Sequence, residues 1–294
     1  MKTDAFSKCH PAVNFIFFMG AIISTVLIQH PAYLAAGLVC SGTYYLLLKG
    51  AGGWKLMAGL IPLYILVTAI NPLFNTYGET VLLTFFGRPY TLEALLYGGA
   101  IAAVFVETIL WFGCYNVVLT SDKFTSLFGN LIPALSLLLV MVLRLIPSFL
   151  RKARQITGAR SSIGKGGTGQ DSQKEKLMSG LVVLGALTSW ALEGSLVTAD
   201  SMKSRGYGCG KRSSFMLYTM TGRDGILIAC EAVFMVLMII FGNRTATYTP
   251  DFYIAPVAGL GLVLGLCFYT GYLFIPIALF IKEAVQWHIS ISGI

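Results

Sequence analysis

The feature that most constrains this sequence is a series of apolar runs, each long enough to enter a lipid bilayer. A helix crossing the hydrocarbon needs about 20 mostly apolar residues, with roughly 17–25 the usual range. The runs of this kind are Ala12–Ile28, Ala32–Leu48, Leu56–Ile70, Thr91–Leu119, Gly225–Phe241 and Val257–Ile281. Only 12% of the residues are charged, about half the share typical of soluble domains. We therefore expect an all-α integral membrane protein with about six transmembrane helices.

The positions of Lys and Arg predict which ends of these helices face the cytoplasm, because cationic loops stay on that side. The cations of the N-terminus and of the second loop are Lys2, Lys8, Lys49 and Lys55. With those segments inside, the polar stretch Asn71–Tyr90 and the later stretch Asn243–Ala255 are expected outside. Within the first, Val81–Phe86 is too short to cross and is expected to form an extended or hairpin segment. Thr91 is expected to cap the helix that follows.

A basic stretch from Arg144 to Arg223 separates the fourth and fifth predicted crossings and holds thirteen of the chain's 21 Lys and Arg residues. The apolar segment Leu131–Leu150 follows Thr120–Thr125, which the alternation of crossings places inside, and it ends beside the cations Arg151, Lys152 and Arg154. Leu177–Met202 is flanked by Lys174 and Lys176 and by Lys203 and Arg205, so neither segment is predicted to cross. Both are expected to be helices at the cytoplasmic interface, joined by a flexible turn at Gly158–Gln173. The predicted domains are residues 1–125 (N-terminal transmembrane helices), 126–222 (cytoplasmic and interfacial helices) and 223–294 (C-terminal transmembrane helices).

Charged and ligand-type residues inside the apolar runs are few. Glu107 lies deep in the fourth predicted helix, and Glu93 lies fourteen residues earlier on roughly the same face. Charges at such depth are costly and often functional, which allows a proton or ion relay. A packing or pairing role against a neighbouring helix is the interpretation we favour, because no partner is visible in the sequence. The histidines, His10, His30 and His288, are far apart, and structural roles are expected for them rather than metal binding.

No cofactor, metal site or nucleic-acid-binding module is predicted. The segment Gly158–Gly166 looks like a phosphate loop, but its spacing is one residue too long and Gly166 replaces the hydroxyl that would hold magnesium. The six cysteines are scattered with no C-x-x-C pair, so neither a disulfide framework nor a zinc site is indicated. The cationic excess is explained by membrane topology, and nucleic acid is not an expected partner.

Two arginines at the ends of the basic insert's helices are candidates for contact with a soluble protein. Arg205 is followed by Gly206, and glycine just past the last turn is the usual helix stop. A cation there suits the negative end of a helix, which alone explains its presence. A guanidinium group also offers a rigid fork of donors to carboxylates of another protein. The similar position of Arg160 on the preceding insert helix favours this second role.

Five short motifs in this sequence match one known family of transporter subunits. They are His10–Phe15, Asn71–Asn75, Pro133–Leu139, Leu143–Pro147 and Thr198–Gly208. With them the chain resembles the T component, the transmembrane coupling subunit, of energy-coupling factor (ECF) transporters. In that family two Ala-Arg-Gly-type motifs end coupling helices that dock on a pair of ATPase subunits. The matching positions here are Ala159, Arg160 and Ser161, and Ser204, Arg205 and Gly206; the first motif lacks the glycine and the second lacks the alanine.

The resemblance implies a non-enzymatic subunit of a vitamin or transition-metal importer in the cell membrane of a prokaryote. Its expected partners are two ECF ATPase subunits, a substrate-binding membrane subunit (the S component) and the lipid membrane, and its coupling region is expected in the cytoplasm. An integral membrane enzyme and a self-sufficient carrier are the alternatives. The enzyme would need clustered His, Asp or metal ligands at the interface, and the carrier would show inverted repeats with polar residues at the midplane.

Overall fold

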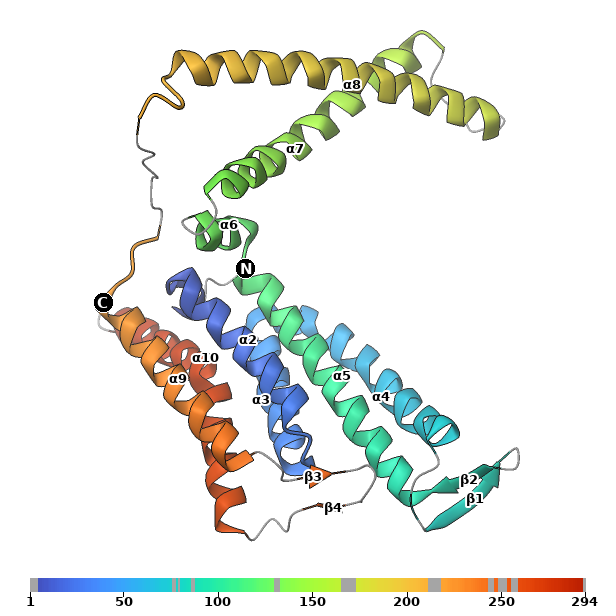
Figure 1. The fold of residues 1–294 in the computed structure, drawn as a ribbon, viewed down its shortest axis with the longest axis vertical. Helices are drawn as coiled ribbons and strands as arrows, with labels where there is room; N and C mark the ends of the chain where they lie inside the picture. Colours follow the sequence, from blue (N-terminus) through green and yellow to red (C-terminus); the bar gives the residue numbers. More distant parts are fainter. Residues whose placement is uncertain are drawn as a thin grey trace. The chain divides into compact units, whose positions relative to one another are not determined.

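The computed structural model describes residues 5–75, 78, 80–85, 88–129, 133–164, 173–210, 218–242, 246–247, 253–254 and 259–292. Most of these residues are helical, as the sequence predicts. Contacts divide the chain into two units, which are Met1–Phe124 together with Tyr218–Ile294, and Thr125–Leu217. We call the first unit the bundle and the second the insert (Figure 1).

The bundle is built from helices of both chain ends. Its elements are α1 (Ala5–Lys8), α2 (Pro11–Leu27), α3 (Pro31–Lys49), the short 3-10 turn η1 (Gly50–Gly53), α4 (Trp54–Phe74), α5 (Leu92–Val118), α9 (Gly222–Gly242) and α10 (Leu260–Ser292). α5 has the central position, because α2, α3 and α4 all pack against it. α9 and α10 pack on each other and close the bundle against α2 and α3.

Two of these helices begin with the same N-cap arrangement, a histidine followed by a proline. His10 and His30 are the N-caps of α2 and α3, and the Nδ1 atom of each accepts the backbone N–H two residues on, at 3.2 Å in both cases. Proline follows at the first helical position, where its missing N–H leaves no helical hydrogen bond unmade. The structural roles predicted for these two histidines are thus confirmed. Thr91 is the N-cap of α5, as predicted, and accepts the backbone N–H of Ala94 at 3.4 Å.

Consecutive bundle helices alternate in direction (Figure 1). α3 and α5 run the same way, because Gly37 lies against Glu107 while Tyr45, further along, lies against Gly113. Their connections therefore fall at two opposite ends of the bundle. This is the alternation on which the predicted sidedness of the loops depends.

One end of the bundle collects most of its cations, and we call it the cationic end. The cations there are Lys8, Lys49, Lys55, Lys123, Arg223 and Lys282. Lys8 pairs with Glu283 of α10, and Lys123 donates to the carbonyl oxygens of Ser7 and Val118. At the opposite end, the described bundle residues include one cation, Arg88.

The insert leaves and re-enters the bundle at this cationic end. On the way out, Lys123 contacts Ser7. On the way back, the Asp224 carboxylate accepts the backbone N–H of His10 at 3.1 Å. Because both points lie beside the start of α2, the insert must cross a membrane either twice or not at all.

Short hairpins close the other end. β1 (Val81–Phe85) pairs antiparallel with β2 (Arg88–Thr91), and β3 (Ala246–Thr247) with β4 (Tyr253–Ile254). The first confirms the extended hairpin expected there.

The polar stretch begins later than predicted, because α4 continues to Phe74. Pro72 leaves the carbonyl oxygen of Thr68 without its usual helical partner, and that oxygen lies where Gly98 of α5 packs closely.

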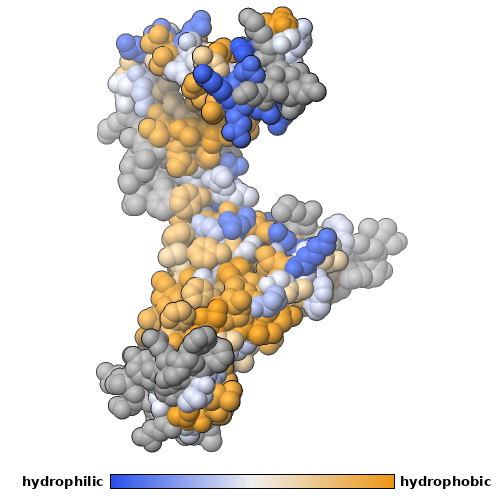
Figure 2. All heavy atoms as spheres, turned by 90° about the vertical axis from the view of Figure 1, so that its right-hand side faces the viewer, coloured by the Kyte–Doolittle hydropathy of each residue, from blue (hydrophilic) through white to orange (hydrophobic). Residues whose placement is uncertain are grey.

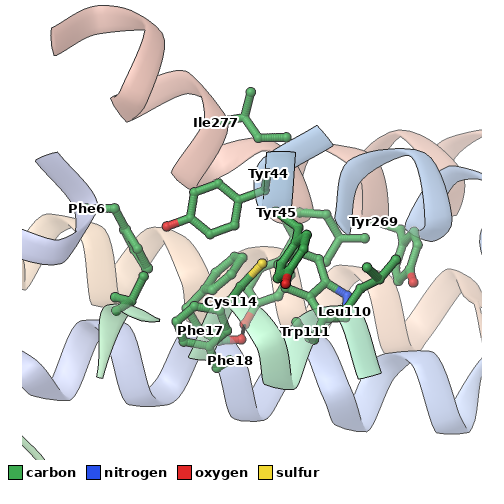
Figure 3. Packing of buried hydrophobic residues seen from close by; sticks show 14 of the residues in the cluster. Phe6, Phe17, Phe18, Tyr44, Tyr45, Leu110, Trp111, Cys114, Tyr269 and Ile277 are labelled. Carbon is green, nitrogen blue, oxygen red and sulfur yellow. Dashed lines mark hydrogen bonds between the residues drawn. The ribbon is translucent and has the colours of Figure 1, made fainter. Parts of the chain in front are cut away.

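Aromatic rings from several helices fill the bundle centre (Figure 3). Trp111 of α5 is fully buried and meets Phe17 of α2 edge-on, with ring centroids 5.6 Å apart. Phe17 also stacks on Tyr272 of α10 at 5.1 Å, and Tyr44 of α3 lies beside Trp111 at 6.5 Å. Such pairs contribute about 0.5–1.5 kcal/mol each beyond area burial, so they fix α2, α3, α5 and α10 against one another.

The outer surface of the bundle is apolar, and orange side chains dominate the face shown in Figure 2. In the described part of the chain, five helical segments are long and apolar enough to cross a membrane. They are Pro31–Phe74 (α3, η1 and α4 together), Leu92–Val118, Gln173–Ser204, Gly222–Phe241 and Leu260–Trp287, and α2 is a shorter apolar helix. The chain is an all-α, multi-pass membrane protein.

The insert contains two long helices, α7 (Pro133–Ser162) and α8 (Gln173–Ser204), preceded by the short α6 (Ser121–Gly129). α7 runs further than predicted, and the assignment of Gly158–Ser162 to a flexible turn is wrong. The hydroxyls of Ser161 and Ser162 donate to carbonyl oxygens one turn earlier, at 2.9 and 3.1 Å, and one glycine costs a helix only about 1 kcal/mol. Ile163 and Gly164 form a turn as predicted, Gln173 is instead the first residue of α8, and residues 165–172 lie outside the described residues.

Candidate coupling site on the insert helices

α7 and α8 cross each other in an antiparallel sense. Phe149 of α7 meets Trp190 of α8 edge-on, with centroids 5.4 Å apart, and Lys152 lies 5.9 Å from the centre of the same indole ring. Later in α7, the Arg160 Nη2 atom donates to the hydroxyl of Ser179, earlier in α8, at 3.3 Å. These contacts join the second half of α7 to the first half and the middle of α8.

Arg205 closes α8 at a left-handed helix cap. The backbone N–H of Tyr207 reaches the carbonyl oxygen of Met202 at 3.0 Å, and the N–H of Gly206 reaches that of Lys203 at 2.9 Å. This is the Schellman pattern, which places a residue of positive φ just past the helix. Gly206 has φ +80°, a conformation that costs other L-residues about 1–2 kcal/mol. The Arg-Gly pair is thus a helix end that presents an exposed guanidinium group.

Arg160 sits differently. It lies in the last turn of α7, and the left-handed glycine follows four residues later at Gly164, with φ +74°. Its side chain is half-buried against α8 through Ser179. Its neighbours Ala159 and Ser161 are exposed.

The two predicted motifs are therefore held apart rather than brought together. Arg160 lies beside Ser179, and Arg205 follows 26 residues further along α8. At 1.5 Å per residue this separates the two arginines by about 39 Å along the helix. The Ser204 hydroxyl is engaged within α8, donating to the carbonyl oxygen of Asp200 at 2.9 Å. A single small ligand could not contact both arginines, whereas two protein partners could take one each.

Much of the apolar surface of both insert helices is exposed. None of the described residues of α8 is buried, and seven of its apolar side chains are at least 60% exposed: Leu177, Met178, Leu181, Leu184, Leu192, Leu196 and Val197. On α7 the exposed apolar side chains include Leu138, Val140, Val142, Leu145, Ile146 and Leu150. Apolar surface of this extent in an otherwise charged region indicates contact with lipid or with another protein.

No protein-family model matches the sequence, and no curated protein matches it significantly.

The bundle contains a second polar site, centred on Glu107. This side chain is fully buried, and its Oε1 atom accepts hydrogen bonds from Thr25 of α2 at 2.8 Å, Trp111 at 3.2 Å and Tyr269 of α10 at 3.1 Å. Gly37 of α3 makes room for it, because a Cβ there would lie 2.1 Å from Oε1. These contacts agree with the packing or pairing role favoured for Glu107 from the sequence, because they join α5 to α2, α3 and α10.

Glu93 does not share this site. Its carboxylate accepts the Thr80 hydroxyl at 2.6 Å, next to the β1 hairpin. Glu93 and Glu107 are fourteen residues apart, which is about 21 Å of helix, so the two carboxylates are not within reach of each other. Of the partners of Glu107, only Trp111 was readable from the sequence, since it lies one helical turn away.

Two buried polar residues were missed by the sequence reasoning. Glu231 of α9 and Asn14 of α2 are 1% and 0% exposed, and their side-chain oxygens and nitrogen have no hydrogen-bond partner among the described residues. For Glu231 the sequence did carry a signal, because it is a single acid in the middle of the apolar run Gly225–Phe241. The described residues contain no group of three or more His, Cys, Asp or Glu side chains placed to hold a metal ion.

Proposed function

We propose that this chain is the transmembrane coupling subunit, or T component, of an ECF-type importer in a prokaryotic cell membrane. The observation that carries the proposal is the pair of long insert helices, each with an arginine at its C-terminal end, about 39 Å apart by helical rise. Two separated cationic ends suit two separate ATPase subunits. The resemblance of the motifs around Arg160 and Arg205 to the family's docking motifs supports the same assignment.

The crossing of α7 and α8 supplies a mechanical link. Aromatic contact between Phe149 and Trp190 and the bond from Arg160 to Ser179 hold the two helices at one place. A displacement of either arginine by an ATPase subunit is then transmitted along a helix to the exposed apolar side chains. Those surfaces are the proposed contact for a separate substrate-binding S component, whose cargo is a vitamin or transition-metal micronutrient.

The proposed topology is six crossings, by α2, α3, α4, α5, α9 and α10, with the insert in the cytoplasm. The cationic end of the bundle supports that orientation. α8 is long and apolar enough to cross, but cations flank both its ends, with Lys174 and Lys176 at the first and Lys203 and Arg205 at the second. If neither α7 nor α8 crosses, the insert leaves and returns at the same end of the bundle, as the structure requires.

Removal of the two arginines tests the proposal. Truncating one partner of a desolvated charge pair costs about 2–5 kcal/mol, so the double variant Arg160→Ala, Arg205→Ala should lose copurification of the ATPase subunits and substrate uptake. Arg205→Ala should be the more severe single change, because Arg205 is exposed whereas Arg160 also bonds within the insert. Lys replacements should rescue only in part, because the planar fork is lost.

The matched control is Arg151→Ala, which removes an exposed arginine of α7 outside both motifs and should leave copurification nearly unchanged. The double variant should still insert in the membrane, since neither side chain is needed for crossing. Full assembly and transport by the double variant would contradict the proposal.

A self-sufficient carrier is the second candidate, and Glu231 is the observation that favours it. A buried ionisable residue within a membrane helix often marks an ion or proton pathway. Proteoliposomes containing only this chain distinguish the candidates. Uptake without partner subunits that disappears in Glu231→Gln would favour the carrier, whereas uptake that requires ATPase and S-component subunits would favour the coupling subunit.

A further inference from the structure

α7 carries a charge imbalance that the proposed coupling role does not use. The helix contains no acidic residue over its 30 residues. Its cations are Arg144, Arg151, Lys152, Arg154 and Arg160. By contrast, α8 balances three acidic residues against three lysines. The cationic excess of the insert's two long helices therefore resides in α7.

Three of these cations form a row on one side of α7. Arg144, Arg151 and Arg154 are separated by seven and three residues, which places them on the same helical face. The side facing α8 is marked by Phe149 and Arg160, which contact α8 directly. At about 100° per residue, the three arginines lie roughly 140–220° around the helix from Phe149. We call Arg144, Arg151 and Arg154 the arginine row, and it faces away from α8.

The arginine row is exposed and has no acidic partner. All three side chains are exposed, and none of them forms an ion pair with any part of the chain that the structure describes. The acids of α8, which are Glu175, Glu193 and Asp200, belong to the helix on the opposite side of α7. The row is therefore available to an anionic partner from outside the chain.

The apolar residues beside the arginines indicate what kind of partner this is. Val140, Leu143, Pro147 and Leu150 lie on the same side of α7 as the row or at its edge, and Val140 and Leu150 are about half exposed. An acidic protein groove or a nucleic acid would not favour apolar side chains between its cationic contacts. The boundary between lipid headgroups and acyl chains does, because arginine stems lie along the apolar layer while guanidinium groups reach the phosphates.

The connection to the bundle is consistent with a membrane partner. α7 begins fifteen residues after α5 ends, and the connection includes the nine residues of α6. It leaves from the cationic end of a membrane-crossing bundle, where Lys123 is tied to Val118. So short a connection allows α7 to start at the bilayer surface.

We propose that the arginine row binds the phosphates of anionic lipid headgroups and holds α7 along the membrane surface. Guanidinium groups bind phosphate oxygens in a bidentate manner. This role is independent of ATPase docking, because Arg160 lies on the other side of the helix. In this proposal the lipid contact positions α7 at the membrane surface, and Arg160 at the end of α7 binds an ATPase subunit.

The test uses the purified full-length chain in a neutral detergent, with bound lipids counted by native mass spectrometry. Phosphatidylglycerol and phosphatidylcholine with the same acyl chains are the two probes. The row variant is Arg144→Gln, Arg151→Gln, Arg154→Gln, and its charge-matched control is Lys174→Gln, Lys176→Gln, Lys203→Gln on α8. Each cation near an anionic surface is worth about 1 kcal/mol, so the row variant should bind phosphatidylglycerol on the order of 100-fold more weakly.

Several comparisons make the result decisive. Phosphatidylcholine binding should be the same in all proteins, and the α8 control should keep its affinity for phosphatidylglycerol within about threefold. A triple Arg→Lys variant should bind more strongly than the Gln variant but more weakly than the wild type, because the charge is kept and the planar fork is lost. All variants should unfold at the wild-type temperature, since the changed side chains are exposed.

The proposal is overturned if the row variant keeps its affinity for phosphatidylglycerol, or if the α8 control loses as much. It is also overturned if inorganic phosphate at millimolar concentration displaces the lipid, because the row would then be a soluble-anion site. A row variant that binds lipid normally but loses a copurifying protein would assign the row to a protein partner instead.

Discussion

The contact between Gly37 and Glu107 allows a sharp test of the bundle's polar centre. An alanine Cβ at position 37 would lie 2.1 Å from Oε1 and 2.5 Å from the carboxyl carbon of Glu107. Ordinary contacts are longer by more than 1 Å, so the carboxylate must rotate away. Rotation removes its hydrogen bonds to Thr25, Trp111 and Tyr269.

The expected loss of stability follows from these contacts. Three hydrogen bonds at about 1 kcal/mol each contribute roughly 3 kcal/mol, and replacing glycine in a helix returns about 0.5–1 kcal/mol. Gly37→Ala should therefore lower the free energy of unfolding by about 2 kcal/mol or more, since buried donors left unpaired add to the loss. Unfolding of the purified chain in mixed micelles by increasing denaturing detergent measures this difference.

A double-mutant cycle identifies the cause. In a Glu107→Ala background the carboxylate is gone, so Gly37→Ala should be neutral or stabilising by up to about 1 kcal/mol. In a Glu107→Gln background the side chain has the same size, so Gly37→Ala should remain destabilising. The control is Gly59→Ala on α4, where an added Cβ meets nothing within 4 Å. Equal destabilisation by Gly37→Ala in the wild-type and Glu107→Ala backgrounds would refute the reasoning.

Two further predictions concern topology and the α8 cap. In a background without native cysteines, Lys55→Cys and Leu83→Cys should be labelled from opposite sides of the membrane, because they lie at opposite ends of the bundle. Glu175→Cys should be labelled from the Lys55 side; labelling from the Leu83 side would mean that α7 and α8 both cross. Gly206→Ala should cost about 1–2 kcal/mol at its positive φ and speed amide exchange in the last turn of α8. Gly194→Ala, mid-helix in open space, should slow exchange instead, and unchanged exchange in Gly206→Ala would argue against the cap.

The helices of the bundle were predictable because their signals are local. An apolar run of suitable length and a capping residue followed by proline are both visible within twenty residues. The starts of α2 and α3 differ from the predicted ones by one residue. The hairpin of β1 and β2 was predictable for the same reason, since the six-residue segment Val81–Phe86 between turn residues is too short to cross a bilayer.

The polar centre could not be predicted, because its members are far apart in sequence. Nothing in a local pattern relates Thr25 or Tyr269 to Glu107, and the glycine that admits the carboxylate looks like any other glycine of a membrane helix. The end of α7 was misplaced because Gly158 and the serines after it have the composition of a turn. Their hydroxyls bond back to the helix, and contact of Arg160 with α8 supports the last turn.

The Glu107 site also bears on how the protein is made. Thr25, Gly37 and Trp111 are all synthesised before or soon after Glu107, but Tyr269 follows it by 162 residues. At about 5–20 residues per second, the newly inserted N-terminal helices wait roughly 10–30 s for α10. During that interval the carboxylate lacks one of its donors and the side of α3 that α10 will cover faces lipid. The protein's maturation therefore depends on α10, and a chain truncated before α10 would present an incompletely shielded acid to the membrane quality-control proteases.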